Sequence, residues 1–193
     1  MREELNPLYE PPQSVSRSNR KKITLIVLVL IAGIGLYYVL PLLLVVFVAQ
    51  PIRVAGAAMV PTLNDGDRVF ISKRVGTLQR GDIVVFNYPE DPSKSFIERV
   101  IGLPGDRLDV DLDGNITVNA QVLKEEYLNP SRNRAARSRW RNTMQEWKEI
   151  KPDHYFVMGD NRDVSNDSRS WGQVPRDLIY GKYLFRYWAS RAD

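Results

Sequence analysis

The 193-residue sequence contains no cysteine and a single histidine, His154. The absence of cysteine excludes disulfides, zinc–thiolate sites and cysteine nucleophiles. One histidine makes neither a metal site nor a Ser-His-Asp triad, and His154 is expected at the end of a strand. No GxGxxG segment or P-loop is present, so a nucleotide site is not expected either. The chain is therefore expected to work without a metal or another cofactor.

Charge is also absent from a long stretch, of which residues 23–49 are almost purely apolar. As a helix this stretch would be about 40 Å long, which exceeds the roughly 30 Å hydrocarbon core of a bilayer. Basic residues abut its N-terminal end: Arg17, Arg20, Lys21 and Lys22. Only Arg53 closely follows the other end. The positive-inside bias therefore predicts a single-pass protein of the cell membrane, with a cytoplasmic tail over 1–22 and an exoplasmic domain from residue 51.

A cleaved signal peptide is the alternative interpretation of the apolar stretch. Ala55-Gly56-Ala57 is an A-x-A sequence of the kind found at cleavage sites. The apolar region of a signal peptide is only about 7–15 residues long, however, so a retained transmembrane helix is favoured. The segment 1–22, with Pro11-Pro12 and several serines, has the composition of a disordered tail.

Short alternating or β-branched segments follow the apolar stretch and predict strands. Asp113-Gly114 lies between two alternating runs, which is a strong hairpin signal. Turn sequences such as Asn64-Asp65-Gly66 separate other segments. The spacing predicts a mainly β domain, a barrel or a sandwich, over residues 51–188. The predicted strands are 67–75, 82–89, 96–102, the two sides of the 113–114 turn, 154–160 and 180–188.

Three blocks of this region are long and specific: AMVPTLNDGD at 58–67, GDIVVFNYPEDPSKSFIERVIGLPGD at 81–106 and MGDNRDVSNDSRSWGQVP at 158–175. Together they resemble the type I signal peptidases, the bacterial leader peptidases. The blocks stand in the family's order behind an N-terminal anchor. The resemblance implies a membrane-anchored β-fold serine endopeptidase that removes signal peptides from exported proteins with a Ser/Lys dyad.

Both dyad positions of that family are replaced in this sequence. The family's serine immediately precedes the Met-x-Pro-Thr segment of the first block, and this position is Ala58. The family's lysine immediately precedes the Arg-Val-Ile-Gly segment of the second block, and this position is Glu98. A serine needs a neighbouring base to become a nucleophile, and a lysine is that base only where burial lowers its pKa. The chain therefore keeps the blocks around the dyad but lacks its nucleophile and its base.

The sequence offers few substitutes for the dyad. Ser72-Lys73 and Ser93-Lys94 are adjacent pairs, but neighbouring residues of a strand point to opposite faces. Glu98 could act with a second carboxylate, Asp160 or Asp167, to activate a water molecule. The resemblance assigns structural roles to both aspartates, so this route is disfavoured.

The resemblance also implies roles for positions around the dyad. The oxyanion region comprises Gly56 and Ala58. Small apolar pockets for the −1 and −3 residues of a signal peptide are expected from Ala57, Met59, Pro61, Ile83, Val84, Val85 and Phe86. Structural positions near the site are Arg99, Asp160, Asn161, Ser165, Asp167 and Arg169. Asp167 and Arg169 are expected to form an ion pair, and Ser165 to face Glu98. A carboxyl group in that dry pocket should be protonated more readily than a free one, unless Arg99 compensates.

Three hypotheses about function follow. The first is a non-catalytic homologue that binds the c-regions of signal peptides or a partner in protein export, such as a catalytic paralogue. The second is a signal peptidase of which this sequence is an inactivated variant. The third, a self-cleaving Ser/Lys repressor, is disfavoured by the anchor and by the lack of a DNA-binding domain. The joint loss of nucleophile and base favours the first hypothesis.

The segment 131–141, SRNRAARSRWR, holds five arginines and no acidic residue. It falls in a predicted insertion at about 129–150 and is interpreted either as a contact with anionic lipid headgroups or as a solvated loop. Nucleic acid is not an expected partner outside the cell membrane. The expected partners are therefore the bilayer and signal peptides or a paralogue, and residues 189–193 are expected to be a C-terminal tail.

Overall fold

The computed structural model describes residues 17–111, 115–129 and 149–190. These residues belong to two units, an N-terminal one up to Leu44 and a second one from Val45. The Asp113-Gly114 turn, the arginine-rich segment 131–141 and most of the predicted N-terminal tail lie outside the described residues. The predictions made for them stay predictions.

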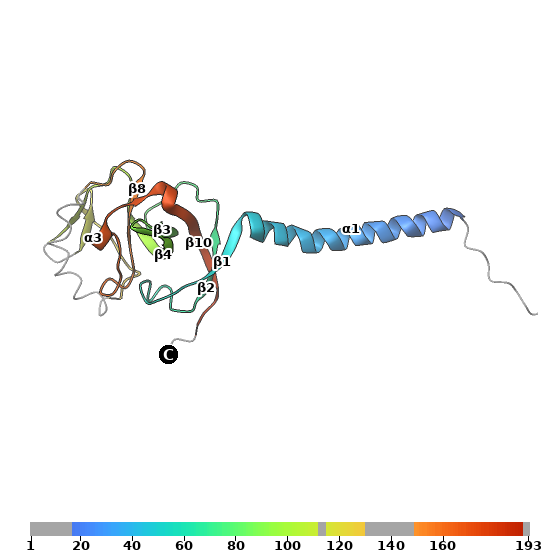
Figure 1. The fold of residues 1–193 in the computed structure, drawn as a ribbon, viewed down its shortest axis with the longest axis horizontal. Helices are drawn as coiled ribbons and strands as arrows, with labels where there is room; N and C mark the ends of the chain where they lie inside the picture. The colour runs from blue at the N-terminus through green and yellow to red at the C-terminus, as the bar shows by residue number, and fades with distance from the viewer. Residues whose placement is uncertain (1–16, 112–114, 130–148, 191–193) are drawn as a thin grey trace, which may run out of the picture. The chain divides into compact units, whose positions relative to one another are not determined.

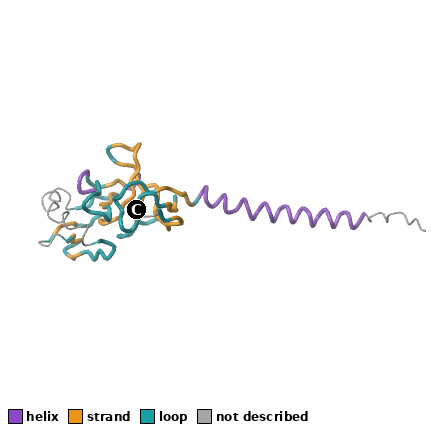
Figure 2. The backbone as a smooth tube through the Cα atoms, turned by 90° about the horizontal axis from the view of Figure 1, so that it is seen from below, coloured by secondary structure: helices purple, strands orange, loops and turns teal. Residues whose placement is uncertain are grey.

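Helix α1, Arg17–Phe47, is the one long helix of the described residues (Figures 1 and 2). Its segment Asn19–Leu43 has a mean hydropathy of 2.6 and is long and apolar enough to cross a membrane. The helix begins before the predicted start, because lysine and arginine are themselves good helix formers. It ends at Phe47, and Ala49, predicted as the last residue of the helix, instead opens the first strand.

The second unit is built mainly from strands, so the predicted mainly β fold is confirmed. Among the described residues, seven strands form one sheet in the order β1-β2-β10-β3-β4-β8-β9, and β5, β6 and β7 form a second sheet (Figure 1). The strands are β1 Ala49–Arg53, β2 Arg68–Ser72, β3 Ile83–Tyr88, β4 Asp91–Gly102, β5 Leu108–Val110, β6 Ile116–Val118, β7 Gln121–Val122, β8 His154–Met158, β9 Val174–Pro175 and β10 Ile179–Trp188. Two short helices, α3 Ser168–Trp171 and η3 Arg176–Leu178, flank β9.

Each predicted strand segment overlaps a strand of the structure, although β4 begins at Asp91, before the predicted start at residue 96. The two arms of the predicted hairpin, β5 and β6, pair antiparallel with Val110 opposite Ile116. His154 is the first residue of β8, at a strand end as predicted. The sequence patterns do not predict β1, β7 and β9. Strands β7 and β9 have two residues each, which are too few to show an alternation. Strand β1 begins within the apolar stretch that predicts the helix.

Strand β3 is covered on both faces. Ile83 and Val85 pack in one core cluster together with Met59 of the first block, whereas Val84 and Phe86 pack in another cluster with residues of β8. Because successive side chains of a strand point to opposite faces, the continuous apolar run supplies both cores. The first block is thereby held against the sheet next to β3 and β4.

Candidate active site

The first block forms a turn between β1 and β2 that presents two small residues. Met59 is 1% exposed and anchors the turn in the core. Gly56 has φ +85°, a conformation that favours glycine, and its N–H donates to the Asp65 carboxylate at 2.7 Å. Ala57 is exposed and Ala58 is half-buried. The turn therefore buries the Met59 side chain in the core and leaves the small residues Gly56 and Ala57 exposed.

The third block holds this turn by its backbone. The Asn161 N–H donates to the carbonyl of Ala58 at 2.8 Å, and the Asn161 side-chain amide donates to the carbonyl of Ala57 at 3.1 Å. Gly159 comes so close that a Cβ there would lie 2.6 Å from the Ala58 oxygen and 2.4 Å from Ser165 Oγ. These contacts position the backbone of residue 58 whatever side chain it carries.

Asp160 joins the three blocks through a buried ion pair. Arg99 donates to its two carboxylate oxygens, from Nε at 2.8 Å and from Nη2 at 2.6 Å. The Thr62 hydroxyl donates to the same carboxylate at 2.5 Å. Arg99 also donates to the carbonyl of Gly81 at 2.8 Å and lies 4.0 Å from the centroid of the Tyr127 ring. Arg99 therefore forms its ion pair with Asp160 and not with Glu98, the residue before it on β4.

A second buried ion pair, Asp167 with Arg169, is present as predicted. Arg169 donates to the two carboxylate oxygens at 2.6 and 2.7 Å, and the Gly159 N–H donates to Asp167 at 3.1 Å. Arg162 donates to the Gly159 carbonyl at 2.9 Å and forms an ion pair with Glu125. Glu125 lies outside the three blocks, and no pattern in the sequence marks it as part of the site.

Glu98, on β4, is 2% exposed. Its Oε1 accepts a hydrogen bond from the Ser165 hydroxyl at 3.2 Å, so the predicted contact between these residues is present. Its Oε2 has no hydrogen-bond partner, and within the described ranges it is the only buried side-chain nitrogen or oxygen of which this is true. Buried polar atoms are normally paired, so this oxygen marks an incomplete environment.

The surroundings of Glu98 favour its protonated form. Burial raises the pKa of Glu98 well above its ordinary value, and the nearby Asp167 carboxylate raises it further. The Ser165 hydrogen bond and the charges of Arg169 and Arg162 lower this pKa, but they do not outweigh the burial. Removing a carboxylate from water penalises its charged form, which is the main physical cause.

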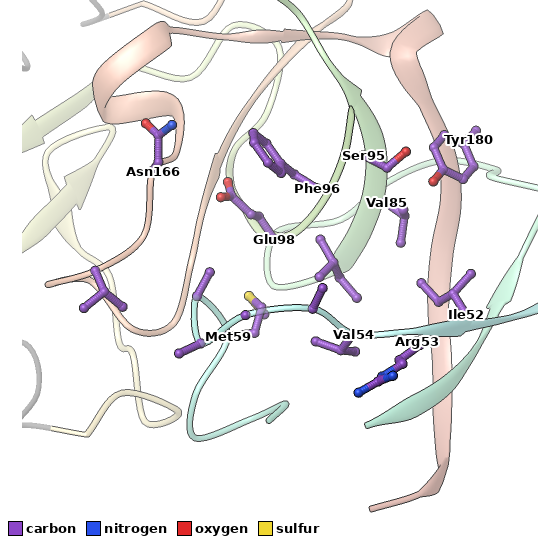
Figure 3. Close-up of a pocket in the computed structure, with 16 residues that line it drawn as sticks. Ile52, Arg53, Val54, Met59, Val85, Ser95, Phe96, Glu98, Asn166 and Tyr180 are labelled. Atoms are coloured by element: carbon purple, nitrogen blue, oxygen red, sulfur yellow. The ribbon is translucent and has the colours of Figure 1, made fainter. Parts of the chain in front are cut away.

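A cleft of about 420 Å³ lies over these residues (Figure 3). Its lining comprises residues 52–59, Val85, residues 95–98, Val164, Asn166 and Tyr180. Ala58 and Glu98 both belong to the lining, so the two positions predicted for the dyad lie at one cavity. In Figure 3 the carboxyl group of Glu98 points away from β4 toward the loop that carries Asn166. The cleft is mainly apolar, with Arg53 and Glu98 as the charged residues of its lining.

Some of the residues predicted for the groove line the cleft, and others do not. Three of them line the cleft: Ala57, Met59 and Val85. Four do not: Pro61, Ile83, Val84 and Phe86. The three from β3 are buried in the two core clusters, because that strand is covered on both faces. Side chains of β1 and β4 take their place, among them Ile52, Phe96 and Ile97.

The residues that could substitute for the dyad make other contacts in the structure. The Ser93 hydroxyl and the Lys94 ammonium both contact Asp91, at 2.6 and 2.8 Å, on an exposed hairpin. Asp160 and Asp167 are each held by an arginine. Over 17–111, 115–129 and 149–190, no group of three or more histidine, aspartate and glutamate side chains is placed to hold a metal ion.

Comparison with known proteins assigns the family. The family model described as signal peptidase, peptidase S26, matches residues 22–188. The chain belongs to this family. The match covers all three blocks, including the turn with Ala58 and the strand β4 with Glu98, so both positions predicted for the dyad lie in the homologous part of the chain.

Several curated relatives are signal peptidases. Signal peptidase I of Pseudomonas fluorescens is 34% identical over 189 residues, covering 75% of this chain and 66% of the relative. Probable signal peptidase I-2 of Synechocystis sp. is 40% identical over 153 residues, covering 74% and 64%. Signal peptidase IB of Staphylococcus aureus is 34% identical over 170 residues, covering 82% and 87%. The chain thus spans about two thirds of the length of the first two relatives.

Among solved structures, a crystal structure of a signal peptidase I from Enterococcus faecalis V583 is similar to this chain. It is 28% identical, with a TM-score of 0.43, and the match covers 57% of this chain and 99% of that one.

The close approach at Gly159 yields a prediction about stability. Gly159→Ala is expected to destabilise the domain by about 1–3 kcal/mol, because the new Cβ would meet the backbone oxygen of Ala58. Chemical denaturation followed by tryptophan fluorescence measures the change. Gly76→Ala is the matched control, since no atom lies within 4 Å of a Cβ at Gly76. Equal losses of stability in the two variants would contradict the described packing.

The raised pKa of Glu98 yields a prediction about pH. The folded chain keeps the proton of Glu98 to higher pH than the unfolded chain does. The free energy of unfolding therefore falls as the pH rises from about 4.3, the pKa of an unfolded glutamate, to the folded pKa, and levels off above it. Glu98→Gln removes this titration. The variant is expected to be more stable than the parent chain at pH 8, by about 1.4 kcal/mol per unit of pKa difference.

Thermal melts between pH 4.5 and 8 check this expectation, with Glu126→Gln as the control because Glu126 is exposed. The gap between Glu98→Gln and the parent chain should shrink toward pH 4.5. A gap that stays constant over this range would show that Glu98 does not titrate as described.

Proposed function

We propose that this chain is a non-hydrolytic, membrane-anchored member of the signal peptidase family, and that it binds the c-regions of signal peptides without cleaving them. The observation that carries the proposal is the pair Ala58 and Glu98 in the lining of one cleft. The family's nucleophile and base would come from these two positions. The joint replacement also favours a natural non-catalytic homologue over an inactivated variant of a signal peptidase.

The chemistry of the two residues supports the absence of hydrolysis. The Ala58 methyl group cannot attack a carbonyl carbon. A general base must accept a proton at the working pH, and the burial of Glu98 raises its pKa and favours the form that already carries one. Without a nucleophile, even well-placed hydrogen-bond donors would have no tetrahedral intermediate to stabilise.

An activated water molecule is also unsupported. Two carboxylates can share this work only when one is available as a base. Asp160 accepts two hydrogen bonds from Arg99, and Asp167 accepts two from Arg169. Both aspartates therefore stabilise the loop rather than offer a free carboxylate beside Glu98.

The retained cleft supports peptide binding. A groove for an extended peptide needs shape and backbone hydrogen bonds, and it needs no nucleophile. The cleft has small residues, Ala55, Gly56, Ala57 and Ala58, along one side and apolar side chains of β3 and β4 along the other. Such a lining suits the small −1 and −3 residues of an A-x-A segment.

The proposed topology follows from the charge pattern. Signal peptidase I homologues are membrane-anchored, and α1 provides one helix of sufficient length and hydropathy. The basic residues before it favour a cytoplasmic tail over 1–22 and an exoplasmic domain over 51–188, with the insertion at 129–150 and a tail from residue 189. Partners would then be the bilayer and exported proteins or a catalytic paralogue in the same membrane.

Activity of the purified chain tests the loss of hydrolysis. In detergent, the chain is expected to leave a preprotein uncleaved and to form no covalent adduct with a penem or lipopeptide that acylates active signal peptidases. Ala58→Ser alone should also be inactive, because it lacks a base. Ala58→Ser combined with Glu98→Lys should recover measurable cleavage, since the pocket around Ser165 is intact. Turnover by the parent chain that disappears in Glu98→Gln would contradict the proposal.

Photocrosslinking tests the retained groove. An A-x-A peptide with a photoreactive group at −1 is expected to label residues 54–59 or 95–98 of the full chain in detergent, because both segments line the cleft. The matched peptide carries bulky residues at −1 and −3 and should label the chain several-fold less. Equal labelling by the two peptides would show that the cleft does not select small residues at −1 and −3.

A further inference from the structure

The unpaired oxygen of Glu98 indicates a ligand contact that the family's chemistry does not require. We propose that the protonated Glu98 carboxyl group is the polar anchor of the cleft and donates a hydrogen bond to a backbone carbonyl of an extended peptide with small, uncharged side chains. This inference rests on the proposed function, because it assumes that such a peptide enters the cleft. It adds a specific contact and makes binding depend on the protonation of one residue.

The carboxyl group of Glu98 is buried, and one of its two oxygens has no hydrogen-bond partner. Glu98 is 2% exposed, its Oε1 is engaged by Ser165, and its Oε2 has no hydrogen-bond partner. A buried polar atom without a partner costs about 1–3 kcal/mol, which a ligand that supplies the partner recovers. Glu98 also belongs to the lining of the cleft, where its carboxyl group extends from β4 toward the Asn166 loop (Figure 3). Oε2 is itself buried, so the carboxyl group must rotate toward the cleft to donate to a ligand there.

The backbone carbonyls of the turn at 57–58 already accept hydrogen bonds from the protein. The carbonyl of Ala58 already accepts from the Asn161 N–H, and the carbonyl of Ala57 accepts from the Asn161 side chain. Ala58 supplies a methyl group where a serine would supply a hydroxyl. Among the described residues, the Ser165 hydroxyl is the one group that hydrogen-bonds to the Glu98 carboxyl group. The backbone carbonyl of a bound peptide can accept a hydrogen bond from Glu98 without bringing a charge into the apolar cleft.

The charges around Glu98 favour a neutral partner over a cation. The loop after β8 and α3 bring one acid and two bases near it: Asp167, Arg162 and Arg169. Each of these is already in an ion pair, Asp167 with Arg169 and Arg162 with Glu125. β3 contributes no aspartate, glutamate, lysine, arginine or histidine, and the turn 56–59 is apolar. Arg53, the other charged residue of the lining, is exposed and would repel a cation.

The proton linkage has a definite sign. The neutral carboxyl group can donate to a carbonyl oxygen, whereas the carboxylate cannot donate and would face that oxygen with like charge. Peptide affinity should therefore be highest at low pH and fall as the pH rises through the pKa of Glu98. The fall is at most about tenfold per pH unit for one linked proton. The bound peptide should in turn raise the pKa of Glu98.

Fluorescence anisotropy of a labelled, uncharged A-x-A peptide tests the proposal, with the full chain in detergent between pH 5 and 9. The parent chain should lose affinity as the pH rises. Glu98→Gln keeps a donor but cannot ionise, so its affinity should not depend on pH. Glu98→Ala should bind about tenfold more weakly at low pH, as expected for one lost hydrogen bond. Glu126→Gln, at an exposed position, should behave like the parent chain.

The outcomes separate this inference from the proposed function. Peptide binding that is unchanged in Glu98→Ala would overturn the contact while leaving the groove. Affinity that rises with pH and falls in Glu98→Gln would overturn it in favour of a carboxylate that binds a cation. Absence of binding by every variant at every pH would overturn both proposals. Carbon-13 NMR of the glutamate carboxyl groups in the parent chain gives a readout that needs no variant, because saturating peptide should raise the pKa of one buried glutamate.

Discussion

The hydrogen bonds from Asn161 to the carbonyls of residues 57 and 58 are the interaction on which the rest of the site depends. They are made to the backbone, so they are insensitive to the side chain at position 58. The Arg99–Asp160 ion pair ties the same loop to β4, which carries Glu98 on the cleft. These contacts hold the backbone around Ala58 and Glu98, and both residues line the cleft of about 420 Å³.

Burial at position 98 has opposite chemical consequences for a lysine and a glutamate. Low polarity favours the neutral form of either side chain, so it lowers the pKa of an amine and raises that of a carboxylic acid. A neutral amine can accept a proton and act as a base. A neutral carboxylic acid can only donate one. Under the proposed assignment, a pocket that would keep a lysine neutral as a proton acceptor keeps Glu98 neutral as a hydrogen-bond donor, and Ala58 offers no group for a base to activate.

The fold class and much of the site could be predicted from the sequence, and the exceptions have physical reasons. Apolar length predicts the helix, alternation predicts the strands, and the family blocks predict the contact between Ser165 and Glu98. The residues 83–86 were all predicted for the groove, but only Val85 lines the cleft. Alternation along a strand covered on both faces does not reveal which face carries a cavity. Glu125 was not predicted, because an acidic residue in a loop carries no pattern and its ion pair is a long-range contact.

Native mass spectrometry of the full chain in detergent, incubated for hours with an A-x-A peptide at pH 6, tests the central claim most directly. It reports binding, cleavage and acylation in one spectrum. The account predicts a one-to-one complex that carries the intact mass of the peptide, with no product peptides and no covalent adduct. Product masses, or an acyl adduct on the chain, would contradict it.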